Sequence, residues 1–387
     1  MKLINNRFYF DYNATSPLAP SVQEWIAKGD LPFANPSSIH HSGKQAKKHI
    51  NETTEFLFDT FSLEKSHDVF YHSGASEGIN TIVKGLSFSA FKEKKKFTFI
   101  HSKTDHSCIN NLREDLELLG HKVIAFDVDD QGDISLEEVV SLVKQCEGEV
   151  LLNYTFVNNE TGVVWPLEDA LKIKEQTGCL VHVDAVQSIG KINEWETIKE
   201  ELDFYTYSAH KFGGMKGVGF SFVRHGLRFH PLVRGGGQQQ GMRSGTENVP
   251  GIYSIKLALK DLMASFSYEE LKQARDLIEE HLLSLSSRLV VAGAKAKKRN
   301  ANTIYLIIPG QKVDVLMTAF DLSRVDISSG SACSSGAIVP SRVLLSMGYS
   351  EAESKSAIRF SFSHLMRKEM VDDYIEVIGR VLKRFLK

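Results

Sequence analysis

Apolar and polar positions follow two different periods along the first 250 residues. Short apolar runs predict strands at 68–72, 97–101, 122–126, 150–154, 180–183, 204–207 and 218–222. Apolar residues at helical spacing predict helices at 43–61, 74–89, 107–119, 135–146 and 167–176. Strands and helices that alternate in this way predict an α/β fold with a mostly parallel sheet covered on both faces.

The pattern changes after about residue 251. Two long helical stretches at 252–265 and 268–285 lead into a predicted strand at 302–308 and a helix at 313–322. We therefore expect two domains: a large α/β domain over 13–255, and a smaller α+β domain built from 1–12 and 256–387.

Composition narrows the classes of function. The 46 basic and 48 acidic residues nearly cancel, so neither nucleic acid nor a membrane surface is expected as a direct partner. No apolar run has the length of a signal peptide or a membrane span, which predicts a soluble cytoplasmic protein. The four cysteines form no Cys-x-x-Cys pair, which argues against a structural zinc site and a disulfide framework.

Polar residues gather where the predicted strands end. Ligands of such sheets bind beyond the carboxyl ends of the strands, so these side chains are expected to share one edge. They are His106, Asn159, Asp184, Gln187, Ser208, His210 and Lys211. The small residues Gly74, Ala75 and Ser76 open the next helix, where backbone N–H groups can hold an anion, although the turn could equally be a plain cap.

Each of these residues also has an ordinary interpretation. Lys211 alone could lie in a polar turn, Asp184 could cap a helix, and the histidines could be loop residues. An aspartate and a lysine at neighbouring strand ends nevertheless suit pyridoxal phosphate (PLP). A lysine amine forms a Schiff base with this cofactor, and a carboxylate keeps its ring nitrogen protonated.

Five motifs together resemble those of cysteine desulfurases of the NifS/IscS-like group, which are fold-type I PLP enzymes of the class V aminotransferase family. The motifs are HVDAVQS at 182–188, SAHK at 208–211, GGGQ at 235–238, GMRSGTEN at 241–248 and SSGSAC at 328–333. The resemblance runs from residue 8 to about residue 364. It implies a large domain with a mostly parallel seven-stranded sheet, plus a smaller α+β domain that carries a cysteine loop.

The resemblance also implies roles for individual residues. Lys211 would hold PLP covalently and move the Cα proton of the substrate, and Asp184 would pair with the ring nitrogen. His106 would stack on the ring and assist in proton transfer, so that Lys211, His106 and Cys333 would be the catalytic residues. The remaining cofactor contacts would come from Ala75, Ser76, Asn159, Gln187, Ser208 and His210, with Thr246 reaching the phosphate in the neighbouring subunit of a homodimer. The substrate, L-cysteine, would be bound by Asn35, Asn159 and Arg359.

Cys333 would be the nucleophile of such an enzyme. It lies among small residues at 328–336, where a thiol could be exposed, although it could also be an incidental surface cysteine. The resemblance implies that its thiolate attacks the substrate sulfur, which leaves a persulfide on Cys333 and releases alanine. The persulfide sulfur would pass to an acceptor protein, either an iron–sulfur scaffold or a tRNA-thiolation protein.

Three other functions remain open from the sequence. A selenocysteine lyase or a class V aminotransferase would share the fold and the cofactor, but an aminotransferase would not need Cys333. A non-catalytic regulatory paralogue would be expected to lack Lys211, Asp184 or Cys333, and the chain has all three.

Overall fold

The computed structural model describes residues 6–330 and 339–386. Its centre is a seven-stranded sheet with the strand order β2-β8-β7-β6-β5-β3-β4. The bounds are β2 (His67–His72), β3 (Phe97–Ser102), β4 (Lys122–Phe126), β5 (Glu149–Thr155), β6 (Leu180–Asp184), β7 (Phe204–Ser208) and β8 (Gly219–Arg224). Strand β8 is antiparallel to both of its neighbours, and the other neighbouring pairs are parallel. The predicted seven-stranded, mostly parallel sheet is confirmed.

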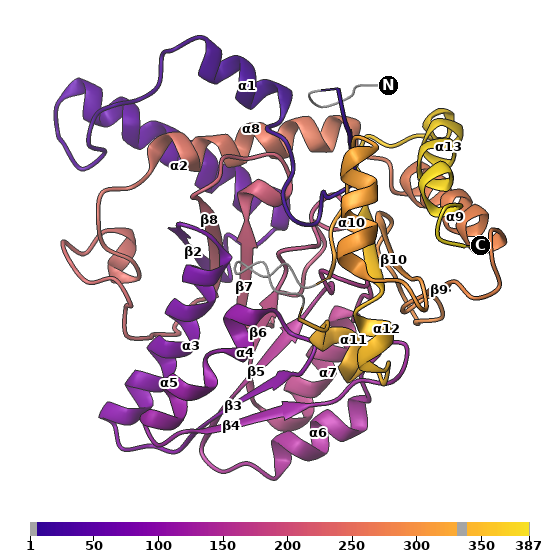
Figure 1. Cartoon of the computed structure of the whole chain (residues 1–387). Helices are drawn as coiled ribbons and strands as arrows, with labels where there is room; N and C mark the ends of the chain where they lie inside the picture. The colour runs from indigo at the N-terminus through magenta and orange to yellow at the C-terminus, as the bar shows by residue number, and fades with distance from the viewer. Residues whose placement is uncertain (1–5, 331–338, 387) are drawn as a thin grey trace.

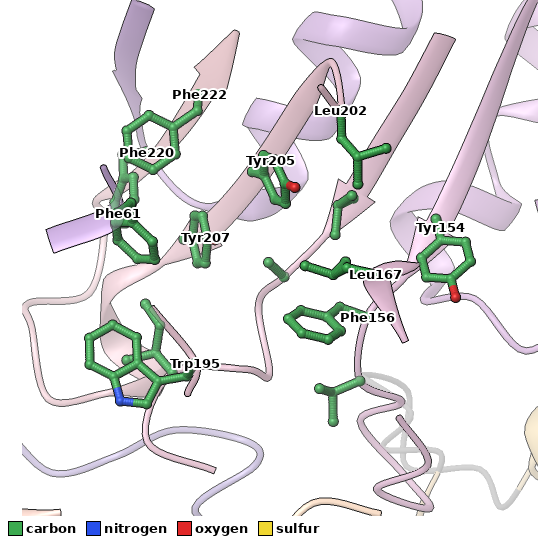
Figure 2. Close-up of a cluster of buried hydrophobic side chains, with 14 of the residues drawn as sticks. Phe61, Tyr154, Phe156, Leu167, Trp195, Leu202, Tyr205, Tyr207, Phe220 and Phe222 are labelled. Carbon is green, nitrogen blue, oxygen red and sulfur yellow. The ribbon is translucent and has the colours of Figure 1, made fainter. Parts of the chain in front are cut away.

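Helices cover both faces of this sheet (Figure 1). One face packs against α3 (Ala75–Lys92), α4 (Ser107–Asn110) and α5 (Arg113–Leu118). The other packs against α1 (Pro20–Ala27), α2 (His41–Phe61), α6 (Leu136–Lys144), α7 (Leu167–Thr177) and α8 (Val249–Ser265). The second core combines aliphatic side chains with a group of aromatic ones, among them Phe61, Tyr205, Tyr207, Phe220 and Phe222 (Figure 2). Each aromatic side chain removes a large apolar area from water when the chain folds.

The C-terminal third forms two small sheets. The three-stranded sheet has the order β12-β10-β9, with β9 (Val290–Val291), β10 (Thr303–Ile307) and β12 (Ala357–Ser361). The two-stranded sheet pairs β1 (Phe8–Tyr9) with β11 (Val325–Asp326) in parallel. A separate apolar core joins them to α9 (Tyr268–Ser284), α10 (Val313–Leu322) and α13 (Val371–Leu382). The short helices α11 (Arg342–Ser346) and α12 (Glu351–Ser354) complete this part.

The predicted domain boundary between residues 255 and 256 falls inside α8. The buried side chains of that helix, as far as Leu262, belong to the core of the large sheet. The N-terminal strand β1 lies with the C-terminal elements, where the sequence places it. The boundary itself stays a prediction. Among the described residues, no helix combines the length and the apolar character that crossing a bilayer requires.

Candidate active site

A cavity of ≈ 890 Å³ lies at the carboxyl ends of β3, β5, β6 and β7. The three-stranded sheet closes one side of it through Arg359 on β12. Most of the residues nominated from the sequence line this one space: Ala75, Ser76, His106, Asn159, Asp184, Gln187, Ser208, His210, Lys211 and Arg359. Strands that are parallel end at the same edge, which is why residues so distant in sequence meet here.

Lys211 ends a short 3₁₀ turn, Ala209–Lys211, that follows β7. Its Nζ donates hydrogen bonds to the backbone carbonyls of Asn13 (2.7 Å) and Ala14 (2.9 Å). Burial, and then the charge of Arg359, lower the pKa of Lys211 to about 8. An amine with such a pKa is partly unprotonated near neutral pH, which is the form that attacks a carbonyl.

Asp184 is the last residue of β6 and is 8 % exposed. One of its oxygens accepts a hydrogen bond from the backbone N–H of Val186 (3.1 Å). Burial raises the pKa of Asp184 to about 6. No cationic side chain of the described chain lies within ion-pair distance of this carboxylate. A buried carboxylate without an ion-pair partner suits a ligand that brings its own positive charge.

His106 is the N-cap of α4, and its Nδ1 accepts a hydrogen bond from the backbone N–H of Cys108 (3.2 Å). A backbone N–H can only donate, so the neutral ring carries its proton on Nε2. The surrounding protein removes water from around the ring, and this desolvation lowers the pKa of His106. The positive charges of Lys211 and Arg342 lower it further. The ring is therefore a neutral Nε2–H donor at the cavity wall.

The N-terminus of α3 opens into the same cavity through Gly74, Ala75 and Ser76. Within the described residues, no side chain caps this helix. Its first backbone N–H groups and the positive end of its dipole can therefore hold an anion. Ser208 and His210 line the cavity as well, and His210 Nδ1 lies 3.1 Å from Thr15 Oγ1.

Arg359 is 4 % exposed and has partners from two parts of the chain. Its guanidinium donates to Asp11 Oδ1 (2.8 Å) and to the backbone carbonyl of Asn159 (2.9 Å). Its Nε finds no partner among the described residues. Gln187 donates from Nε2 to the carbonyl of Asn13 (2.9 Å), and its Oε1 accepts from the buried Lys191. Both side chains are thus fixed before any ligand is bound.

These groups fit PLP. An amine of lowered pKa can bind its aldehyde, an unpaired carboxylate can face its ring nitrogen, and an uncapped helix N-terminus can take its phosphate. Among the described residues, no three or more His, Cys, Asp or Glu side chains are grouped so that they could hold a metal ion.

Two nominated residues among the described ones do not line the cavity of this chain, and a third lies outside the described residues. Asn35 and Thr246 are exposed and lie outside it. Cys333 lies outside the described residues, although Gly330 and Val339, which border residues 331–338, both line the cavity. The roles of all three stay predictions.

The structure adds residues that the sequence reasoning did not nominate. Asp105, Cys108, Glu160 and Arg342 line the cavity, and Asn13 supplies the carbonyl that Lys211 and Gln187 share. Asp105 could have been nominated from the sequence, because it follows a predicted strand and directly precedes His106. The others depend on contacts between distant segments, which no local pattern reveals.

The fold and the cavity together define a fold-type I PLP enzyme. The family model of aminotransferase class-V matches residues 8–374, and the chain belongs to that family. The class V aminotransferases are PLP-dependent.

Named relatives are similar over nearly the whole chain. A protein called cysteine desulfurase IscS from Clostridium botulinum is 30% identical over 385 residues, which cover 98% of this chain and 96% of the relative. A solved NifS-like protein is 31% identical with a TM-score of 0.85, covering 98% of this chain and 100% of that one. A structure of SspA in complex with cysteine is 29% identical with a TM-score of 0.77, covering 92% and 98%.

Proposed function

We propose that this chain is a PLP-dependent cysteine desulfurase. The overall reaction would convert L-cysteine and the thiol of Cys333 into L-alanine and a Cys333 persulfide. One observation carries the proposal: Lys211, Asp184 and Arg359 line a single cavity in a chain whose full-length relatives bear the name cysteine desulfurase. The solved relative in complex with cysteine supports the same substrate.

The described residues suit the proton transfers that the reaction needs. When bound, PLP takes up the electron pair released at the Cα of the substrate. Lys211, with a pKa of about 8, can accept a proton at Nζ and return it within the same cavity. Asp184 would keep the ring nitrogen protonated, and its ionised form is favoured by that positive charge. His106 would present its Nε2–H to the bound ligand.

Arg359 is proposed to bind the carboxylate of the substrate, with Asn159 and Asn35 as further substrate contacts. Its Nε–H is buried and has no partner among the described residues, so one donor of the guanidinium is uncommitted. Asp11 and the Asn159 carbonyl hold the rest of the group in place. An anchored guanidinium loses little freedom when the substrate binds.

In the sulfur-transfer step, the thiolate of Cys333 would attack the substrate sulfur. The S–S bond forms as the C–S bond of the substrate breaks, and the bonding electron pair remains with the substrate carbon, which gains a proton on the way to alanine. The atoms balance without an outside oxidant or reductant. Release of the sulfur from the persulfide needs an acceptor thiol or another reductant.

The activity can be tested with purified protein loaded with PLP. We expect alanine and a Cys333 persulfide from L-cysteine in a single turnover, detected by mass spectrometry. Lys211→Ala should lose both products by at least about 1,000-fold, because covalent attachment and proton transfer are removed together. Cys333→Ala should lose the persulfide but keep any transamination. Unchanged desulfuration by either variant would refute the proposal.

The partners proposed are a second copy of the chain and a sulfur-acceptor protein, either an iron–sulfur scaffold or a tRNA-thiolation protein, and the proposed location is the cytoplasm. Thr246, exposed and outside the cavity of its own chain, would contact the phosphate in the partner subunit.

Heterodimers of a Lys211→Ala chain and a Thr246→Val chain test whether Thr246 acts in the partner subunit. They should contain one complete site and regain activity, whereas a Thr246 that acts within its own chain would leave them inactive.

A further inference from the structure

A row of buried polar side chains crosses one face of the seven-stranded sheet. The row has one member on each of five adjoining strands: Asn153, His182, Thr206, Ser221 and His72. Two positions away on four of these strands lie Leu151, Phe204, Val223 and Phe70, which belong to the apolar core beneath α3. Residues two apart on a strand share a face, so the row lies between that core and the cavity.

Asn153 fixes the direction of the hydrogen bonds at one end of the row. Its Nδ2 donates to Asp105 Oδ2 (2.8 Å), and its Oδ1 lies 2.7 Å from His182 Nδ1. An amide oxygen can only accept, so His182 carries a hydrogen on Nδ1. Burial lowers the pKa of His182 to about 3, so the ring is neutral and its Nε2 is an acceptor.

The rest of the row follows from that tautomer. Nε2 of His182 accepts from the hydroxyl of Thr206 (2.8 Å), whose oxygen then accepts from Ser221 (2.8 Å). Ser221 in turn accepts from Nε2–H of His72 (3.0 Å). Every donor in the row therefore points toward Asp105. Hydrogen bonds aligned in one direction polarise one another, and this strengthens the bond at the acceptor end.

Asp105 is 1 % exposed and lines the cavity. Its carboxylate also accepts from Thr155 Oγ1 (2.6 Å) and from the backbone N–H of Ser102 (3.1 Å). Burial raises the pKa of Asp105 to about 7, and the bonds from Thr155 and Asn153 oppose that rise. In the described chain the carboxylate has no ion-pair partner, so only neutral donors stabilise its charge.

We propose that Asp105 is a second anionic group of the cofactor cavity, which the polar row holds in place and whose charge adds to that of Asp184 in keeping bound PLP protonated. This rests on the proposed function. Besides Asp184 on β6, the groups around Asp105 are His106 and Cys108 on the α4 side and Arg342 on α11. Arg342 donates to the backbone carbonyl of Asp105 (3.2 Å) and leaves the carboxylate to the row.

Asp105→Asn separates the charge from the hydrogen bonds. The asparagine oxygen can still accept from Asn153 and Ser102, and its amide can donate to Thr155, so only the negative charge is lost. We expect the pH midpoint of the visible absorption band of bound PLP to fall by about 0.5 to 1 pH unit, because a cation near one anion fewer releases its proton more readily. Absorption is followed from pH 5 to 10 without substrate.

Asp133→Asn is the matched control. Asp133 is also buried, with a pKa that burial raises, but it does not line the cavity. Its midpoint should equal that of the wild type. An Asp105→Asn midpoint equal to that of Asp133→Asn would overturn the inference.

Thr155→Val provides a second variant should Asp105→Asn fail to fold. It removes one donor from Asp105 and should lower the midpoint by a smaller amount; no shift would again overturn the inference. Failure of the proposed function gives a different result. In that case the wild type would bind no PLP or would not desulfurate cysteine, and the inference would fall with it.

Discussion

At the residue scale, the side chains of the cavity are held by hydrogen bonds from distant segments of the chain: the carbonyl of Asn13 accepts from both Lys211 and Gln187. Asp184 and Lys211 could be nominated because a strand pattern precedes each of them. Asn13 could not be nominated, because its importance lies in a contact with Lys211, which is more than a hundred residues away. Lys191 could not be nominated either, because lysines are rarely buried as it is. Hydrogen bonds of this kind are visible only once the chain is folded.

Lys191 offers a test at this scale. Burial, and then the charges of Lys211 and Arg359, lower its pKa well below the usual range, which favours the neutral amine as the donor to Gln187. Lys191→Met should weaken PLP binding by about tenfold, the loss of one buried hydrogen bond that orients a ligand contact. Titration of the apoprotein with PLP measures this. Unchanged affinity would show that Gln187 needs no such anchor.

The same variant has a predictable pH dependence. The unfolded chain holds the lysine proton up to the ordinary pKa, whereas the lowered pKa makes the folded chain release it at a lower pH. The stability of the wild type therefore rises with pH between the folded and the unfolded pKa of Lys191. Lys191→Met lacks this contribution. Its melting temperature relative to the wild type should therefore be higher at pH 6 than at pH 9. A difference that does not change with pH would indicate that Lys191 is charged in the fold.

At the scale of elements, the apolar pattern locates strands well and helix ends less well. The predicted helix at 107–119 is two helices, α4 and α5. The backbone N–H of Asn111 bonds back to the carbonyls of Ser107 and Ile109, which ends α4 in a tight turn, and Asn110 Nδ2 donates to the carbonyl of Asp105. The apolar pattern assigns no element to residues 20–27, but the structure has helix α1 there. The helix begins with Pro20, and the first turn of a helix tolerates proline.

Gly78 in α3 provides the prediction for this scale. A Cβ at this position would lie 2.4 Å from Nε2 of His72, too close for any side chain. Gly78→Ala should lower the free energy of unfolding by about 1–3 kcal/mol, because crowding outweighs the roughly 1 kcal/mol gained in helix propensity. Gly379→Ala in α13 is the control, since its Cβ would meet nothing nearer than 3.7 Å and should be neutral or stabilising. Urea denaturation compares them.

At the scale of the whole molecule, the site lies where the large sheet meets the C-terminal sheets. The predicted α/β class and sheet size are confirmed, because the alternation of strands and helices is a local signal. The joint between the two parts could not be predicted. It depends on Asn13, which donates to the carbonyl of Asn159 (3.1 Å) and to Thr303 (2.9 Å) and accepts from Asn302 (3.2 Å).

Asn13→Ala should loosen this joint. The variant leaves buried partners on both sides unsatisfied, and we expect it to destabilise the protein by about 2–4 kcal/mol. The backbone carbonyl that receives Lys211 remains. Asn51→Ala, at an exposed position of α2, should change stability by less than about 0.5 kcal/mol. Equal denaturation midpoints for the two variants would contradict a joining role.

The parallel pairing of β1 with β11 sets an order of events during synthesis. Strand β1 is made first, yet its partner lies at Val325–Asp326, and Asp11 bridges to Ser361. The strands of the large sheet, residues 67–224, can leave the ribosome and pair long before that partner exists. The carbonyls that receive Lys211 come from residues 13 and 14, directly after β1. A nascent chain should therefore acquire its cofactor pocket last, and a chain cut before residue 325 should hold the large sheet without a finished pocket.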